Sequence, residues 1–235
     1  MWKNIHINKA IIFIFTAPTL LTTKIASSQD IIENLLDILP LELDLGSWSI
    51  YEVKDNPTKT TLILREAITG EEYLNNKKCY WLETEIIPIV GFASVYRFLI
   101  QPESEGKHSI LKIVTREGAN LPETYNYDTI QNQPAEEMVK KKLIGEELIE
   151  YRTGKVRAKH YNIEIEHKEI DIWVAPEIKP LGLVRLRSKD GEMTLVKHGK
   201  GGVESKSSLL QDKESSSETK EDKRASEHID VKVEK

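Results

Sequence analysis

The chain has 235 residues, with 33 lysines and arginines, 38 aspartates and glutamates, and a formal net charge of −5. This length fits one medium-sized domain with appended segments and is enough to bury a hydrophobic core. An acidic chain with interleaved charges lacks the basic patch typical of nucleic-acid-binding proteins, so we expect no nucleic-acid partner. The single cysteine excludes an intramolecular disulfide framework and a metal centre built from several cysteines.

Residues 1–28 have the pattern of an export signal. Lys3 and Lys9 precede an apolar run of about a dozen residues, which suits a signal peptide and is short for a membrane-spanning helix. Ala26 and Ser28 form a small-x-small cleavage pattern, which predicts a mature chain that begins near Gln29. We expect export into the periplasm of a Gram-negative-type bacterium. Secretion from the cell is the alternative for the mature chain, and an uncleaved anchor is the alternative for the segment.

Residues 200–235 are predicted to be a disordered, charged tail. Serine, lysine and glutamate alternate there, and residues 212–223 contain no large apolar side chain. Such a composition cannot bury enough apolar surface to offset the entropy lost on ordering. The organised domain is therefore expected to span residues 29–199.

That domain is predicted to open with a short amphipathic helix. Asp30 is a candidate N-cap and Pro40 a stop signal. The apolar residues between them follow helical spacing: Ile31, Ile32, Leu35, Leu36 and Leu39. A second brief helix is predicted over residues 136–143, after a loop over residues 117–133.

After Gly46 the hydrophobic period changes to two, which predicts strands. About ten are expected, over residues 48–53, 59–68, 78–87, 94–100, 109–115, 147–152, 156–166, 170–174, 183–187 and 193–197. Turns are expected at Thr69-Gly70 and at residues 189–191, where Gly191 would supply a positive φ. Short turns favour antiparallel pairing. The predicted fold class is mainly β (α+β): a curved antiparallel sheet or open half-barrel, covered by the two helices.

Two parts of the chain resemble a group of uncharacterised exported bacterial proteins. The opening part is residues 39–53 (LPLELDLGSWSIYEV). The closing part comprises the pair His160-Tyr161 and residues 171–184 (DIWVAPEIKPLGLV). Those proteins are similar to the LolA/LolB-like superfamily of periplasmic lipoprotein carriers. The resemblance implies an incomplete antiparallel barrel with helical lids that holds acyl chains.

No residue pattern in the chain indicates catalysis. Cys79 begins a strand without a neighbouring base and is predicted to be a buried thiol. His160, Glu164 and Glu166 share a strand face, but each two-residue step spans about 6.6 Å, which favours a solvated polar face over a metal site. An unrecognised enzyme site would be sought at His160 and Asp171. There is no phosphate-binding loop, nucleophile elbow or zinc signature. We therefore predict a non-enzymatic protein with no cofactor and no metal.

The first functional hypothesis is the binding of an apolar ligand, such as a lipid or acyl chain, inside the half-barrel. Apolar strand positions that would line the interior are Leu62, Leu64, Leu82, Ile86, Val95 and Leu99, and the positions on the leading helix are Leu35, Leu36 and Leu39. Affinity would come from apolar area, at about 0.8 kcal/mol per buried methylene.

The alternative hypothesis is a structural or interaction protein of the cell envelope whose barrel is filled by its own side chains. Residues 86–93 continue an apolar run through a turn, where polar residues are usual. An exposed apolar tip there would bind an envelope protein or a membrane surface through Ile87, Ile89, Val90 and Phe92. A cavity favours the first hypothesis, and a packed interior favours the second.

Overall fold

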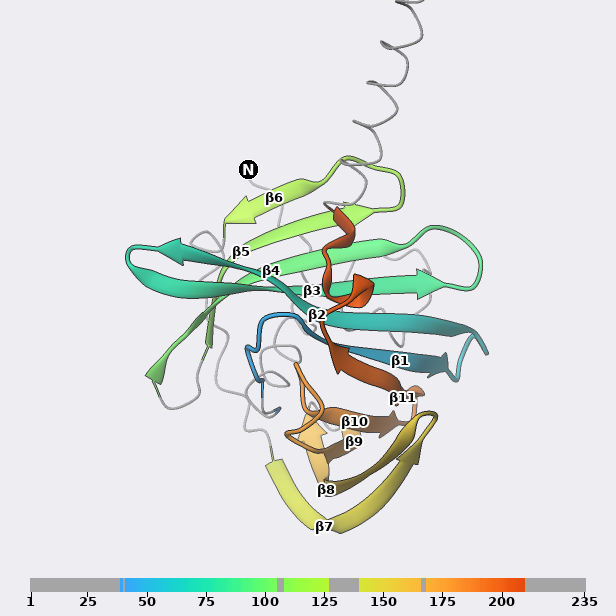
Figure 1. Ribbon diagram of the computed structural model, residues 1–235. Coiled ribbons are helices and arrows are strands. Elements are labelled where there is room, and N and C mark those ends of the chain that lie inside the picture. The colour runs from blue at the N-terminus through green and yellow to red at the C-terminus, as the bar shows by residue number, and fades with distance from the viewer. Residues whose placement is uncertain (1–38, 40, 105–107, 127–139, 166–167, 210–235) are drawn as a thin grey trace, which may run out of the picture.

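The computed structural model describes residues 39, 41–104, 108–126, 140–165 and 168–209 (Figure 1). Within them lie eleven strands and the short 3-10 helix η3 (Val203–Ser205). The strands are β1 (Ser47–Asp55), β2 (Thr61–Leu74), β3 (Lys77–Pro88), β4 (Ser94–Pro102), β5 (His108–Glu117), β6 (Glu123–Asn126), β7 (Lys140–Tyr151), β8 (Gly154–Ile165), β9 (Lys168–Val174), β10 (Leu183–Ser188) and β11 (Gly191–Lys200). No helix in this part of the chain is long and apolar enough to cross a membrane.

The strands form one antiparallel sheet in the order β6-β5-β4-β3-β2-β1-β11-β10-β9-β8-β7. All neighbours follow one another in sequence except β1 and β11. The sheet ends at β6 and β7 and is not closed into a barrel. The prediction of a mainly β, open antiparallel sheet is therefore confirmed. One strand more than expected is present, because β6 lies inside the predicted loop over residues 117–133.

The predicted turn at Thr69-Gly70 is wrong. Strand β2 continues to Leu74, and the chain turns at Asn75 and Asn76, whose φ angles are +49° and +63°. Two consecutive positive φ angles are the requirement of a type I′ hairpin turn, and asparagine tolerates them. Gly70 instead follows a register shift between β2 and β3, because a glycine inside a strand often marks a bulge.

The turn before β11 lies where the sequence predicts it, but its backbone differs from the expectation. Gly191 does not have a positive φ, and it pairs with Asp55 as the first residue of β11. The hairpin therefore turns at residues 189–190.

The helical lids are not found as predicted. Residues 140–143, assigned to the second helix, begin β7, because their pairing with β8 overrides a weak helical stripe. The remainder of that helix and the leading helix up to residue 38 lie outside the described residues.

Two described segments of the chain contribute buried side chains to the inner face of the sheet. We call the face of the sheet that carries Leu64, Leu82, Ile86 and Phe98 the inner face. On neighbouring strands Leu64 lies opposite Ile86, and Leu82 lies opposite Phe98, so these side chains point to the same side. Residues 39–46 and the β9–β10 loop, residues 175–182, contribute buried side chains to the same core cluster: Leu39, Leu41, Ala175, Ile178 and Leu181. The two segments lie side by side (Figure 1), joined by the Glu42 amide, which donates to the Pro180 carbonyl oxygen at 2.8 Å. Side chains of both segments are thus part of the core on the inner face.

The outer face is crossed by the end of the described chain. Residues 201–209, which we call the C-terminal strap, leave β11 and run back over β2 and β3 (Figure 1). Ser207 and Leu209 are buried. Residues 201–209, which the sequence assigns to the tail, therefore pack on the sheet. Residues 210–235 and the predicted signal, residues 1–28, lie outside the described residues.

Shortening a side chain of the inner cover is expected to destabilise the whole sheet. Ile178 is 1 % exposed, so Ile178→Ala should lower the free energy of unfolding by about 2–5 kcal/mol through lost burial and a residual cavity. Urea denaturation measures this. Ile89→Ala, at a position that is 77 % exposed, should change stability by less than about 0.5 kcal/mol. Equal effects at the two positions would contradict the place of Ile178 in this core.

Candidate functional site

Four of the six strand positions predicted to line a cavity lie on the inner face. Leu64, Leu82 and Ile86 are buried in the main core, and Leu62 is partly buried against it. Leu39, the described position of the leading helix, belongs to the same core. These side chains pack with the protein's own segments, and ligand binding at them stays a prediction. Leu35 and Leu36 lie outside the described residues.

The assignment of Val95 and Leu99 to the interior is wrong. Val95 lies opposite Glu85, and Leu99 lies opposite Trp81, so both point to the outer face. Leu99 forms a second small core there with Trp81 and Cys79. Strand β4 is apolar on both faces, and such a strand does not reveal from its pattern which face is inside.

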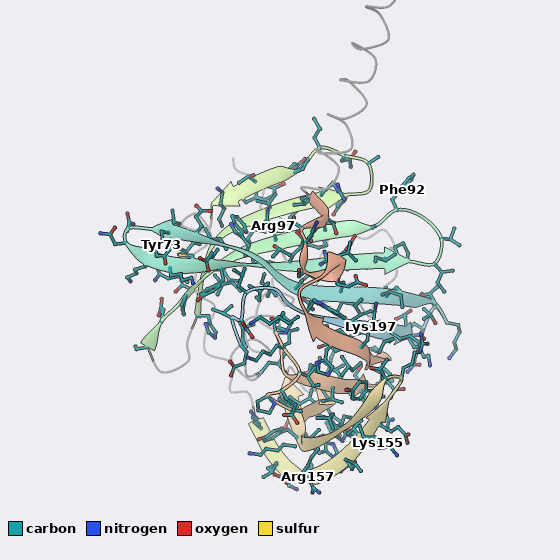
Figure 2. The ribbon with its side chains drawn as sticks, in the orientation of Figure 1. Tyr73, Phe92, Arg97, Lys155, Arg157 and Lys197 are labelled. Atoms are coloured by element: carbon teal, nitrogen blue, oxygen red, sulfur yellow. The ribbon has the colours of Figure 1, made fainter. Side chains whose placement is uncertain are left out.

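The β3–β4 loop is an exposed apolar tip, as the alternative hypothesis expects. Ile87, Ile89, Val90 and Phe92 are 38, 77, 87 and 76 % exposed. Phe92 projects from the end of the sheet in Figure 2. Gly91 has a φ of +114°, a conformation that L side chains rarely adopt, and this lets the loop turn between Val90 and Phe92.

A second loop adds an apolar side chain that sequence reasoning missed. The Gly118 amide donates to the Ala93 carbonyl oxygen at 3.1 Å, which joins the β5–β6 loop to the tip. Phe92 packs over Gly118: a Cβ added to Gly118 would lie 3.3 Å from the Cβ of Phe92. Leu121, in that loop, is 87 % exposed. The apolar tip is therefore defined as Ile87, Ile89, Val90, Phe92 and Leu121.

Glu66 is a deeply buried carboxyl group on the inner face. Glu66 is 2 % exposed and lies opposite Ser49 and Thr84. The Thr84 hydroxyl donates to Glu66 Oε2 at 2.8 Å. Burial raises the pKa of the Glu66 carboxyl to about 8, because the charged form loses its hydration.

On the outer face, two arginines and two glutamates form a buried charge cluster. Arg65 Nε donates to Glu85 Oε2 at 2.9 Å, and its Nη2 donates to Glu83. Arg97 Nε lies 3.4 Å from Glu83, and its guanidinium stacks over the Trp81 ring. Formal charges within this group cancel, so the carboxylates are compensated where water is excluded.

This charge cluster holds the C-terminal strap on the sheet. Arg65 Nη1 donates to the carbonyl oxygens of Glu204 and Lys206, at 2.7 and 3.3 Å. Glu83 accepts the Ser207 hydroxyl and the Ser208 amide. The hydrogen bonds of Arg65 to backbone oxygens explain why a serine-rich segment is ordered here without a large apolar face.

His160 and Asp171, where an enzyme site would be sought, are close together. His160 Nε2 lies 3.1 Å from Asp171 Oδ1, and Nδ1 lies 2.9 Å from Glu147 Oε1. The imidazole stacks on the Trp173 ring with centroids 4.2 Å apart. Both ring nitrogens thus contact carboxylates that are themselves partly exposed. Among the described residues, no group of three or more histidine, cysteine or acidic side chains is placed to hold a metal ion.

Cys79 is fully buried in the second core, as the sequence predicts. Burial raises the pKa of its thiol, since the thiolate would lose its hydration. The thiolate is the nucleophilic form of cysteine. The environment therefore disfavours nucleophilic chemistry at this residue.

Comparisons with known proteins place these features in no established family. No family model matches the sequence, and no curated protein matches it. A solved Bacteroides fragilis protein, provisionally described as exported and with a YmcC-like fold, is 10 % identical; the match covers 69 % of this chain and 99 % of that one, with a TM-score of 0.37. A Parabacteroides distasonis protein, provisionally described as a lipoprotein, is 12 % identical over 68 % of this chain and 98 % of its own, also with a TM-score of 0.37. Likeness at this level carries no functional argument, and the LolA/LolB-like resemblance is not confirmed.

The protonation of Glu66 makes stability depend on pH. Because its pKa is raised from 4.5 to about 8 on folding, the folded protein holds an extra proton between those values. The contribution of Glu66 to the free energy of unfolding is therefore full below about pH 4.5 and is lost as the pH rises towards 8. Glu66→Gln, which mimics the protonated form, should remove that loss. Urea denaturation of both proteins at about pH 5 and pH 8 checks this, and parallel pH profiles would contradict it.

Removing the arginine at the centre of the charge cluster is expected to destabilise the protein strongly. Arg65→Met removes the ion pair from Arg65 Nη2 to Glu83, whose side chain has no exposure, so the free energy of unfolding should fall by about 3–5 kcal/mol. Lys197→Met is the matched control, because Lys197 pairs with Glu204 of the strap at 2.8 Å but is partly exposed. Its loss should cost less than about 1 kcal/mol. Denaturant titration of the two variants distinguishes an essential cluster from an ordinary surface pair.

Proposed function

We propose that this chain is an exported, non-enzymatic interaction protein that binds a partner protein through its apolar tip. One observation carries the proposal: Ile89, Val90 and Phe92 follow one another on a single loop and are each more than three-quarters exposed, and the neighbouring loop, hydrogen-bonded to it, carries the equally exposed Leu121. Single exposed apolar side chains are ordinary on protein surfaces, whereas a contiguous group marks an interaction site.

The packed interior supports this choice over a ligand carrier. The inner-face leucines predicted to line a cavity belong to one core with Ile178 and Leu181 of the β9–β10 loop. That loop and the segment before β1 therefore occupy part of the face that an acyl chain would need. The apolar tip needs no rearrangement, since its side chains already face solvent.

The charges around the tip favour a protein over an anionic membrane surface. Residues 86–94 carry no charged side chain, and residues 117–123 carry Glu117 and Glu123 and no lysine or arginine. Membrane-surface sites combine apolar side chains with basic residues that attract anionic lipid. A large aromatic side chain among aliphatic neighbours is typical of the anchors that dominate protein interfaces, so Phe92 is the expected anchor.

Photo-crosslinking tests the proposal. A benzophenone amino acid replacing Phe92 should form a discrete covalent adduct with a protein when the chain is expressed in its own cells. The same replacement at Tyr73, which is 66 % exposed at the opposite end of the sheet (Figure 2), should not.

A second substitution in the crosslinking chain controls for chance encounters. Val90→Asp should reduce the adduct about tenfold or more, since binding would bury an unpaired charge. Adducts with lipid alone, or equal adducts at positions 92 and 73, would contradict a protein partner at the tip.

A further inference from the structure

The C-terminal strap lies on β2 and β3 as a bound peptide lies on a receptor (Figure 1). Within it Ser207 and Leu209 are the buried residues, and η3 contains none. One leucine is therefore the large apolar side chain that the strap buries. Segments with so few buried apolar contacts open at a lower free energy than the whole protein unfolds. We expect the strap to detach from a sheet that stays folded.

A pair of glycines separates the strap from the sheet. Gly201 and Gly202 have φ angles of +74° and +76°, and a Cβ added at either would meet no atom within 4 Å. Gly201 is anchored, since its amide donates to the Gly46 carbonyl oxygen at 2.8 Å and its own carbonyl oxygen accepts the Trp48 indole nitrogen. The Gly202 carbonyl oxygen instead accepts the Ser205 hydroxyl inside the strap. The strap therefore begins at a turn in open space, just beyond the last anchor.

Two adjacent serines of the strap are recognised by side chains of the sheet. Ser208 Oγ donates to Glu85 Oε2 at 2.7 Å and accepts from Arg65 Nη2 at 2.9 Å. A hydroxyl both donates and accepts, whereas a methyl group does neither and a carboxylate donates nothing. Glu83 accepts the Ser207 hydroxyl and the Ser208 amide. An acidic residue at either serine would face these carboxylates, so the site selects hydroxyl-bearing residues.

The strap backbone and one apolar side chain complete the contacts. Arg65 Nη1 donates to the carbonyl oxygens of Glu204 and Lys206, at 2.7 and 3.3 Å. Such main-chain bonds give affinity to an extended peptide of any sequence, and side-chain contacts give specificity. Leu209 follows the two serines and is 6 % exposed. The pattern that the site recognises is therefore two hydroxyl-bearing residues followed by a large apolar residue.

We infer that the outer face of β2 and β3 is a peptide-binding site, which the strap occupies in cis. Its ligand class is an extended peptide with the pattern of Ser207-Ser208-Leu209. Such a segment of another protein binds when it displaces the strap, so the strap is an autoinhibitory occupant of the site. This inference is independent of the apolar tip, which lies on other loops.

The site keeps its charged groups in place when the strap leaves. The ion pairs from Arg65 to Glu83 and Glu85 join β2 to β3 and do not involve the strap. Water replaces the strap at these groups, so no charge is left buried and unpaired. A preformed site loses less entropy on binding a peptide than a site that must assemble.

Cutting the hinge tests whether the strap is separable. A specific protease site inserted after Gly202 in the full chain places the cut in open space. After cleavage of the folded protein, gel filtration should separate the C-terminal fragment, and the circular dichroism of the sheet should persist. The vacated protein should then bind a fluorescently labelled peptide of residues 201–209 in a saturable titration followed by anisotropy.

Single changes in that peptide test the recognition without affecting the folding of the protein. Ser208→Ala removes a hydroxyl that bonds to two charged groups, so affinity should fall by about tenfold or more. Ser205→Ala is the matched control, because Ser205 Oγ donates to the Gly202 carbonyl oxygen within the strap. Its affinity should stay within about threefold of the unchanged peptide. A peptide of residues 211–219 has adjacent serines but no large apolar residue, and it should bind at least about tenfold more weakly.

Three results would overturn the inference. The first is loss of the sheet signal on cleavage, because the strap would then be an integral part of the fold. The second is a fragment that stays bound on dilution and does not exchange with the labelled peptide. The third is equal affinity of the Ser208→Ala and Ser205→Ala peptides, because the serine hydroxyl would then not be recognised.

Discussion

The pairing of β1 with β11 is the interaction on which the rest of the structure depends. Ser47 lies opposite Lys200, and Asp55 lies opposite Gly191, so the first and last strands are neighbours at the centre of the sheet. Trp48 packs over Gly199, and its indole nitrogen donates to the Gly201 carbonyl oxygen at 2.9 Å. Without this pairing the strands would form two separate meanders. Contacts this distant in sequence carry a large loop-closure cost, and folds that depend on them form slowly.

Once the two meanders are joined, each face of the sheet is covered in its own way. On β2, Leu64 and Glu66 point inwards while Arg65 points outwards, because successive side chains alternate. The inner face receives apolar loops, and burial there raises the pKa of the Glu66 carboxyl, which favours its protonated form. The outer face receives a polar strap, which the Arg65–Glu83 pair binds through backbone and serine oxygens. Over the middle strands, both faces of the sheet thus carry buried side chains, and among the described residues the β3–β4 loop is the more exposed apolar segment.

Part of this arrangement was predictable from residue patterns. Alternating apolar residues located nearly all the strands, and the uncharged run around Phe92 located the exposed tip. The same reasoning placed Val95 and Leu99 on the wrong face, because β4 is buried on both sides and its alternation is uninformative. It placed a helix on residues 140–143, because a few apolar positions fit both periods and only pairing with β8 chooses between them. The strap was missed because its order comes from Arg65, more than a hundred residues away, and not from its own composition.

The sequence by itself determined the class of structure: short strands with period-two patterns and tight turns, joined as an antiparallel sheet, with an apolar loop at residues 86–93. These features follow from local sterics and from the partition of side chains between water and core, which neighbouring residues decide. Only the tertiary structure decided that β1 pairs with β11, that residues 39–46 and 175–182 contribute to the core of the inner face, and that the β5–β6 loop is hydrogen-bonded to the β3–β4 loop. Each of these is a contact between segments distant in the chain. Its free energy depends on which surfaces meet, and no local pattern records that.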